Sequence, residues 1–419
     1  MSSIRPLIPL LIAAGILLGG NGVQGTLIAL RGVQEGFSAE TIGFMGTAYF
    51  VGFLLGCLWI VQVMRAVGHV RTFATFAAIA SAATLVMALA IDAPTWIAMR
   101  FVSGFCFAGL FTVIEAWMNA GVQNRDRARV TSVYRIVDLG CVTGAQFLIP
   151  LFGVEGFAIF AVMSIMITLS LVPVSLGDRS SPSPPEDVNL DLRRAWLISP
   201  LGAMGCIAVG LTNSAFRTLS PIYAQDIGFS VTDVAAFVSV SIIGGAVIQY
   251  PLGYLSDRWD RRFVLLAMTI CSMVAALVLA VAAGTNAMAN FVVVFIFGSV
   301  AMPLYSLSAA HANDHAQKNE FVMLNAALML FYSIGAVGGP IMAAWAMGFL
   351  GPHGLFYYTA AVYGVFIALI LVRMRARPGV PPSRRGRFVA LLRTSPFFAR
   401  LAGRPRGDNP PKSDRGTLQ

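Results

Sequence analysis

Four ionisable side chains interrupt long apolar runs in the first half of the sequence. Arg100 and Glu115 lie in one run, and Arg135 and Asp138 lie in the next. A charge that faced lipid would be costly, so each is expected to face a cavity or a partner. Arg135 and Asp138 are three residues apart and share a helix face. With Glu115 they are expected to form a buried cluster. It would be either a proton or substrate relay, in which a desolvated Glu115 titrates, or a static ion pair between helices.

A second set of residues lies in a short loop between two apolar runs, at positions 253–262. The loop reads Gly-Tyr-Leu-Ser-Asp-Arg-Trp-Asp-Arg-Arg. An acid at a helix junction can lie against the N-terminal dipole of a neighbouring helix, and arginines can bond carboxylates or lipid phosphates. The loop is therefore either an ordinary basic loop or part of a gate. The residues expected to form the gate are Gly253, Asp257, Arg258, Arg261 and Arg262.

Polar residues also stand beside glycines inside two other apolar runs. Asn21 and Gln24 interrupt the N-terminal run, and Asn213 and Arg217 interrupt the run that begins near position 197. Such breaks expose backbone groups that can bind a solute where they line a cavity, although small residues also allow tight helix packing. These four residues are the candidates for a substrate cavity.

No metal site or cofactor is expected. His311, Asn313, Asp314 and His315 lie close together, but their spacing is weak evidence for a metal. The five cysteines all lie in apolar runs without a Cys-x-x-Cys pair, a pattern typical of buried free thiols. The sequence contains neither a phosphate-binding loop for ATP nor a nucleophile motif. An ATP-driven pump and an enzyme are therefore both disfavoured.

The elements that position these residues are expected to be membrane helices. Charged residues make up 11% of the chain and hydrophobic residues 57%, whereas a soluble domain carries about 25% charged residues. Apolar runs of about 20 residues recur, and this is the length of helix that crosses a bilayer core. The twelve expected spans are 7–30, 41–64, 72–91, 95–119, 131–151, 156–175, 197–223, 233–255, 262–283, 288–310, 321–347 and 354–373.

A change of composition divides the chain into two halves. The stretch between the sixth and seventh spans contains Ser-Ser-Pro-Ser-Pro-Pro at 180–185 and several charges. Such a segment does not bury enough apolar area to fold alone. The expected organisation is an N-terminal six-helix bundle at 1–176, a cytoplasmic linker at 177–196, a C-terminal six-helix bundle at 197–374 and a basic tail at 375–419.

Basic residues in the short loops predict the orientation. Twelve of them fall on the side that holds both termini, and Arg31 alone falls on the other side. Positively charged loops stay in the cytoplasm, so both termini are expected there. The N-terminal apolar run is expected to be a retained first span and not a signal peptide.

The tail from Arg373 onward carries an excess of basic residues equal to the whole net charge of +10. Its position beside a span favours anionic lipids, and not nucleic acid, as its partner. Residues 387–401 mix arginines with apolar residues, so they are expected either to lie on the inner leaflet as a short helix or to remain an unfolded tail.

The two halves share landmarks at a nearly constant offset. Gly-Phe-Ser occurs at 36–38 and again at 228–230, 192 positions later. Gly104 in the fourth span corresponds to Gly298 in the tenth. Glycines of the fifth and eleventh spans also correspond, namely Gly140, Gly144, Gly335, Gly338 and Gly339. A duplication is favoured over chance similarity between membrane helices, and parallel repeats around a central site are a transporter architecture.

The pattern Gly-x-x-x-Asp-Arg-x-x-Arg-Arg resembles the loop motif of the major facilitator superfamily. Together with the spans, the linker and the duplication, the resemblance covers roughly residues 5–373. It implies an all-α fold of twelve transmembrane helices in two pseudo-symmetric six-helix bundles, and a secondary transporter that works by alternating access. In that fold Asp257 is expected near 129–135. The first-half copy departs from the motif, because Arg65 replaces the acid, and Arg65 is expected to pair with Glu320 instead.

Arg100 and Gly104 are similar to a fourth-span motif of the same family, whose arginine is associated with proton coupling. The alternative is that Arg100 reaches back to the membrane surface. The stretch from Arg100 through Glu115 to 124–129 resembles the YcaD-like subgroup of bacterial transporters, and the base at Arg65 agrees with that subgroup.

The favoured function is a proton-coupled secondary transporter, a symporter or antiporter. It would move a small-molecule organic substrate across the bacterial inner membrane as a monomer. One alternative is a facilitative carrier without ion coupling, whose transport uncouplers would not affect. The other is a membrane sensor or assembly protein with a transporter-like body, which would transport nothing in a broad panel of solutes.

Overall fold

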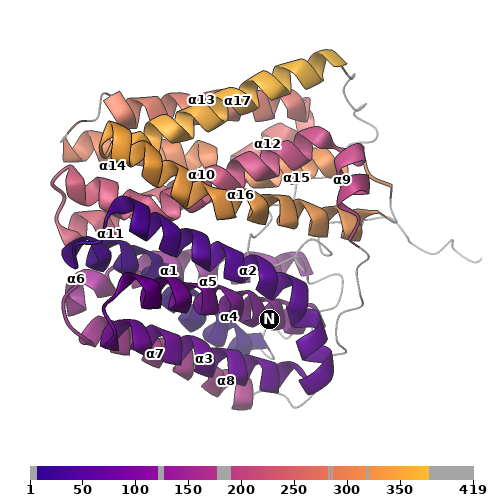
Figure 1. Cartoon of the computed structure of the whole chain (residues 1–419). Helices are drawn as coiled ribbons and strands as arrows, with labels where there is room; N and C mark the ends of the chain where they lie inside the picture. The colour runs from indigo at the N-terminus through magenta and orange to yellow at the C-terminus, as the bar shows by residue number, and fades with distance from the viewer. Residues whose placement is uncertain are drawn as a thin grey trace, which may run out of the picture.

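The computed structural model describes residues 7–120, 127–176, 190–281, 284, 286–317 and 320–376. In this part of the chain every regular element is a helix (Figure 1). The helices are α1 (Ile8–Gln34), α2 (Ala39–Val67), α3 (His69–Leu89), α4 (Ala93–Ala120), α5 (Arg127–Ala145), α6 (Leu148–Phe152), α7 (Ala158–Leu169), α8 (Leu171–Leu176), α9 (Leu192–Ile198), α10 (Pro200–Asp226), α11 (Val231–Val247), α12 (Gln249–Arg258), α13 (Arg261–Val281), α14 (Ala287–Ala301), α15 (Leu304–Asn313), α16 (Phe321–Leu350) and α17 (Gly354–Ala376).

Most of the helical segments in the described part are long and apolar enough to cross a membrane. Ten continuous segments pass that test, and two bent pairs, α9 with α10 and α11 with α12, bring the number to twelve. A helix satisfies its own backbone hydrogen bonds, which a chain in lipid has to do. The predicted all-α membrane fold is confirmed.

The repeated Gly-Phe-Ser sequence forms the same turn in each half. Gly36 and Gly228 have φ angles of +79° and +93°, which is a left-handed conformation that glycine adopts without strain. Ser38 and Ser230 then cap α2 and α11, because each hydroxyl accepts a hydrogen bond from the backbone N–H three residues on. The shared landmark therefore encodes one helix end and the next helix start.

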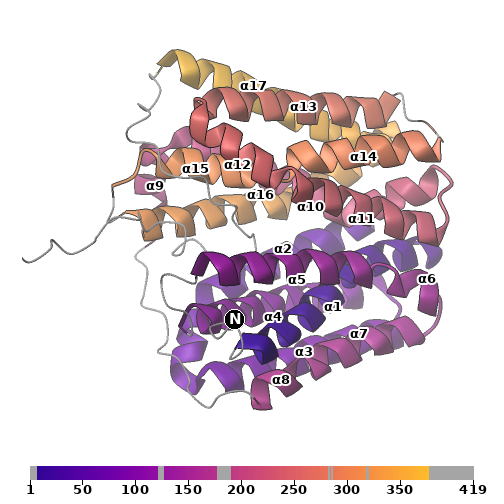
Figure 2. The ribbon, with the colours of Figure 1, turned by 180° about the vertical axis from the view of Figure 1, so that it is seen from behind.

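The packing of the helices repeats as well. α1 packs on α5 and α7, as α10 packs on α16 and α17. α4 packs on both α2 and α3, as α14 packs on both α11 and α13. Figures 1 and 2 show one half, in indigo to magenta, below the other, in pink to yellow. The two halves are copies of one packing arrangement, as a duplication predicts.

Close backbone contacts explain two pairs of shared glycines. A Cβ atom on Gly52 of α2 would collide with a carbonyl oxygen of α4, and one on Gly104 of α4 would collide with a carbonyl oxygen of α2. Gly244 of α11 and Gly298 of α14 stand in the same relation in the second half. In both halves glycine therefore lets these two helices cross with their backbones in contact.

The expected correspondence between glycines of the fifth and eleventh spans holds only in part. Gly335 and Gly339 of α16 lie against the backbone of α10, whereas a Cβ on Gly140 or Gly144 of α5 would meet nothing within 4 Å. The small residues of the matching contact lie on α1, where Gly22 makes room for a valine side chain of α5. Both halves have a close contact between these two helices, but glycines of α1 make room for it in the first half and glycines of α16 in the second.

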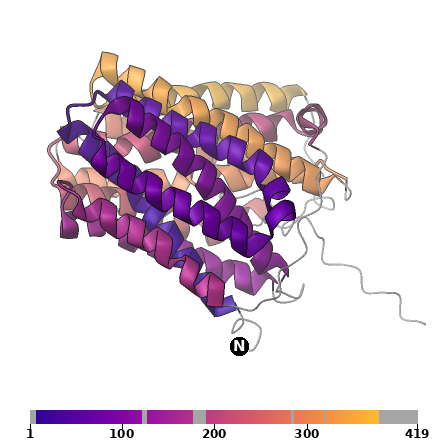
Figure 3. The same cartoon turned by 60° about the horizontal axis from the view of Figure 1, so that its bottom comes forward.

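The halves meet near one end of the molecule. We call the end where α1 leads into α2 the first-loop end, and the opposite end, where α9 lies, the linker end (left and right in Figure 1). α2 and the orange α16 run side by side (Figure 3). Near the first-loop end Gly43 contacts Ala344, and Thr47 Oγ1 donates to the Val337 carbonyl at 2.9 Å. α5 and α6 pack on α11 in the same region.

The linker differs from its predicted extent at its second end. Residues 192–198, most of them expected in the linker, form the separate helix α9, which turns by 111° into α10. Asp191 caps α9 by accepting from a backbone N–H, and Ser199 and Pro200 start α10 in the new direction. The basic tail, including the expected helix at 387–401, lies outside the described residues.

Candidate functional site

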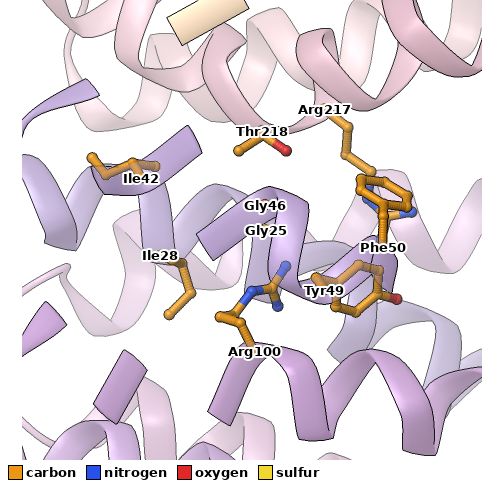
Figure 4. Close-up of a pocket in the computed structure, with 9 residues that line it drawn as sticks. All are labelled: Gly25, Ile28, Ile42, Gly46, Tyr49, Phe50, Arg100, Arg217 and Thr218. Carbon is orange, nitrogen blue, oxygen red and sulfur yellow. The ribbon is translucent and has the colours of Figure 1, made fainter. Parts of the chain in front are cut away.

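A small cavity lies between the two halves, where α1, α2, α4 and α10 meet. The space open to the centre of a water molecule is about 10 Å³, which is room for about one water. In Figure 4, Arg217 and Thr218 enter from the second half, and Arg100 and Tyr49 enter from the first. The lining residues are Gly25, Ile28, Ile42, Gly46, Tyr49, Phe50, Arg100, Arg217 and Thr218.

Arg100 points into the protein. Its side chain is held by α1, because Nη1 donates to Gln24 Oε1 at 2.7 Å, and the residue is only 6% exposed. Its guanidinium carbon lies 4.4 Å from the centre of the Tyr49 ring, a cation–π contact. Gln24 is oriented in turn by donating to Thr84 Oγ1 at 3.2 Å. The alternative in which Arg100 reaches the membrane surface is wrong.

Arg217 connects the halves at the same cavity. It belongs to α10 of the second half, and its Nη2 donates to the backbone carbonyl of Asn21 in α1 at 3.3 Å. The Asn21 side chain accepts a hydrogen bond from the Tyr49 hydroxyl at 2.9 Å. Asn21, Gln24 and Arg217, expected around one cavity, thus lie in one connected group with Arg100 and Tyr49.

Asp138 of α5 lies within the electrostatic reach of this group. The cations that act on its carboxylate are Arg135, one helix turn away, and Arg217 from the second half. Glu115 is completely buried in α4, where it acts on Cys57 of α2. Asp138 is therefore outside the cavity lining but within electrostatic range of Arg217, and Glu115 lies among the helices of the first half.

The sequence does not predict all of the residues that line the cavity. Tyr49 and Phe50 of α2 and Thr218 of α10 line the cavity, but an aromatic or a threonine within an apolar run is ordinary. The available signal was the hydroxyl of Tyr49, because a buried tyrosine hydroxyl requires a hydrogen-bond partner. Asn213 was expected at the cavity and lies one helix turn from Arg217 on α10, outside the lining.

The residues of the loop motif form hydrogen bonds and ion pairs between neighbouring helices of the second half. Arg261 is 2% exposed, and it donates to Asp257 at 3.0 Å, to Asp314 at 2.7 Å and to the Ala310 carbonyl at 3.0 Å. These bonds tie α12 and α13 to the end of α15. The other two arginines have local partners, namely Asp260 for Arg262 and the Tyr254 ring for Arg258. Gly253 lies one turn before Asp257 on α12.

The pairing predicted for Arg65 is wrong. Glu320 accepts from Arg194 Nε at 2.9 Å and from Arg194 Nη2 at 2.7 Å. The sequence predicts that Arg194 lies in the linker, whereas α9 packs on α16 and brings the guanidinium to the start of that helix. The position predicted for Asp257, near 129–135, stays a prediction, because the side chain at the start of that range lies outside the described part of the chain.

Hydrogen bonds from Gln317 and Arg194 stabilise the charged form of Glu320. A hydrogen bond from the Gln317 backbone N–H, followed by the bond from Arg194, holds the pKa of Glu320 below its ordinary value. The carboxylate also lies at the N-terminus of α16, where the helix dipole favours negative charge.

Metal ligands do not gather at the histidines that raised the question. His311 and His315 have ring centres 4.7 Å apart, and His315 Nδ1 lies 2.9 Å from the His311 carbonyl. Over the residues that the structure describes, no group of three or more histidine, cysteine or acidic side chains is placed to hold a metal.

The repeated fold and the polar site between its halves define a multi-pass membrane protein of the transporter class. The chain belongs to the Major Facilitator Superfamily, whose family model matches residues 10–323 and 203–405.

Its relatives agree with the predicted subgroup. The chain is 26% identical over 381 residues to an uncharacterized MFS-type transporter of Enterobacter sp. (strain 638), covering 89% of this chain and 97% of the relative. It is 26% identical over 377 residues to the uncharacterized MFS-type transporter YcaD of Escherichia fergusonii, covering 88% and 96%. The predicted resemblance to YcaD-like transporters is confirmed.

Solved structures share the fold at low sequence identity. The nucleoside transporter NupG superposes with a TM-score of 0.75 at 12% identity, over 90% of this chain and 100% of that one. A bacterial homologue of the human lysosomal transporter Spinster, in an inward-facing and occupied conformation, gives 0.66 at 14% identity, over 92% and 98%.

Proposed function

We propose that this protein is a secondary active transporter that moves a small organic solute across the bacterial inner membrane by alternating access. The observation that carries the proposal is the reach of Arg217 from the second half into the polar group of the first. A site made by both halves changes shape when the halves move, and this is what alternating access requires.

The proposed cycle has a definite starting state. Contacts between α2 and α16 and between α5 and α11 lie toward the first-loop end. The basic loops lie at the linker end, so we assign that end, with both termini, to the cytoplasm. We infer that this arrangement is a state closed on the outside, in which the central space of about 10 Å³ has not opened for a solute. Rocking of the halves about these contacts opens and closes the cytoplasmic side.

Proton coupling is assigned to Asp138. Its carboxylate is within electrostatic range of Arg217, which belongs to the other half, so its protonation would change an electrostatic attraction between the halves. A proton that binds there weakens the hold on Arg217 and couples the proton to the movement. Arg100, which is also at the cavity, holds the solute or the position of α1.

Uptake by purified protein in proteoliposomes, with and without an imposed proton gradient, tests this function. We expect a gradient to drive accumulation, and Asp138→Asn to abolish accumulation while it leaves exchange without a gradient. Asp92→Asn is the matched control, because Asp92 is an exposed helix-capping residue at the first-loop end. Transport that is indifferent to the gradient would establish a facilitative carrier. A complete lack of transport across solutes of every charge would contradict the proposal.

Glu115→Gln separates the two interpretations of the first-half acids. If Glu115 relays protons, this variant loses gradient-driven accumulation at normal expression. If Glu115 is a structural partner of neighbouring helices, the variant lowers thermal stability and keeps coupling in the protein that remains folded.

A further inference from the structure

The cavity between the halves has an unbalanced charge. Arg100 and Arg217 both line it, and none of the other lining residues is acidic. The hydrogen bonds that these two arginines make in the described part of the chain go to neutral oxygens, the amide of Gln24 and the backbone carbonyl of Asn21. Two cations therefore face one small space, and neither is in an ion pair within the described part of the chain.

The two cations also act on each other. The charge of Arg217 is among those that oppose the charge of Arg100, although Arg100 is buried in the first half and Arg217 arrives from the second. Like charges in a poorly solvated site repel, and an opposite charge between them relieves the repulsion. Asp138 is an acid whose charge interacts with that of Arg217, and no ion pair joins the two residues in the described part of the chain.

Arg100 has a hydrogen-bond donor that can bind a further acceptor. Its Nε is buried and has no hydrogen-bond partner among the residues that the structure describes, while Nη1 is bonded to Gln24. An unsatisfied guanidinium N–H next to a cavity is costly unless a ligand completes it. The rings of Tyr49 and Phe50 and the side chains of Ile28 and Ile42 surround the arginines with apolar surface.

We propose that the transported solute is a small organic anion, and that Arg100 and Arg217 bind its carboxylate or phosphate group from opposite halves of the protein. This inference rests on the proposed function and names its substrate class. An anion held between the two arginines replaces their repulsion with two charge-assisted bonds. It also draws the halves together, so binding of the solute favours the closed arrangement. When the halves part and the cavity widens, its apolar lining accepts the remainder of a small solute.

The sign of the charge in the cavity is tested without knowing the solute. Thr218→Cys places a thiol in the lining, and its reaction with two methanethiosulfonates of similar size, one carrying a sulfonate and one a trimethylammonium group, is followed by mass spectrometry of the labelled peptide. Rates are divided by those of each reagent with a free thiol. We expect the sulfonate to react at least about tenfold faster by this measure. Adding Arg217→Gln should remove the preference, and adding Arg71→Gln, an exposed arginine outside the cavity, should not. A preference for the cationic reagent would overturn the proposal.

Matched solutes test the class. Benzoate, benzamide and benzylammonium share one ring, and butanedioate, butanediamide and 1,4-diaminobutane share one chain. Thermal shift of the purified full chain and uptake in proteoliposomes should both favour the anion of each set. Arg100→Gln and Arg217→Gln should each weaken anion binding by about ten- to a hundredfold, because each loses one charged hydrogen bond. Uptake that favours the neutral or cationic members refutes the anion while it leaves transport intact, and uptake of none refutes transport itself.

Discussion

At the scale of single residues, Gln24 decides how well Arg100 is held. Gln24→Leu removes the acceptor of a buried charged hydrogen bond and should destabilise the protein by about 1–3 kcal/mol. Gln24→Glu should keep the thermal stability, because the new carboxylate pairs with Arg100, but it should abolish the response to anions by neutralising that arginine. Thermal denaturation with and without benzoate measures both effects. Equal stability of the two variants would contradict the role of this bond.

Glu320 gives a prediction for pH. Its pKa is lower in the folded protein than its ordinary value of 4.5, so the charged form stabilises the fold above that pH. The contribution is lost as the pH falls through the lowered pKa. Glu320→Gln should therefore lower thermal stability at pH 7, and the difference from the wild type should shrink below about pH 4. Arg194 is 51% exposed, so the effect is expected to stay below about 1 kcal/mol.

The residue types in the sequence predict the side chains of the cavity better than they predict the contacts between those side chains. The interruption of apolar runs by Arg100, Gln24 and Arg217 pointed to the cavity, because polar groups in lipid require partners. Partner choice was less accessible. Arg65 was assigned to Glu320 by symmetry between the halves, whereas Arg194 takes that place. A helix of seven residues after a proline-rich stretch leaves little trace in hydropathy, so the position of Arg194 followed only from the fold.

At the scale of helices, glycines fix how closely pairs approach. Gly52→Ala or Gly104→Ala should destabilise the first half strongly, because the new methyl group would collide with a backbone carbonyl that cannot move without the helix. Gly140→Ala is the matched control. It lies on α5 with open space around it, so alanine should be neutral or stabilise the helix by up to about 1 kcal/mol. The yield of monodisperse protein and its melting temperature measure the difference. A tolerated alanine at Gly52 would mean that α2 and α4 are not packed as described.

The helices themselves were largely predictable, since length, apolar composition and the loop signals are local properties. Gly36 and Ser38 marked a turn that the structure reproduces in the second half. The sequence does not show which helix carries the glycines where two helices pack closely, as α1 and α5 or α10 and α16 do. Gly140 and Gly144 fit the composition of a contact, but their faces point away from one, because the direction of a face depends on how the whole half packs.

At the scale of the whole molecule, movement of the halves is what transport requires. A disulfide between cysteines at Gly43 and Ala344 should join α2 to α16 near the first-loop end and stop transport, and a reductant should restore it. Ser81 and Ser164, whose hydroxyls lie 2.5 Å apart, connect α3 and α7 within one half. A disulfide there should form and leave transport unchanged. Uptake before and after reduction decides the matter, and continued transport by the first cross-linked variant would refute rocking about that contact.

The placement of α9 has a consequence for how this protein can be assembled. The helix is attached to the second half through Arg194 and Glu320 and through the buried side chains of Ala195 and Ile198, so α9 is part of the second half at the linker end. Two separately synthesised fragments, 1–183 and 184–419, should therefore find each other in the membrane and complement one another in an uptake assay. A break between 199 and 200 detaches α9 from α10, and fragments divided there should complement poorly. Assembly would then require that α9 stays joined to the half on which it packs, and would not require one continuous chain.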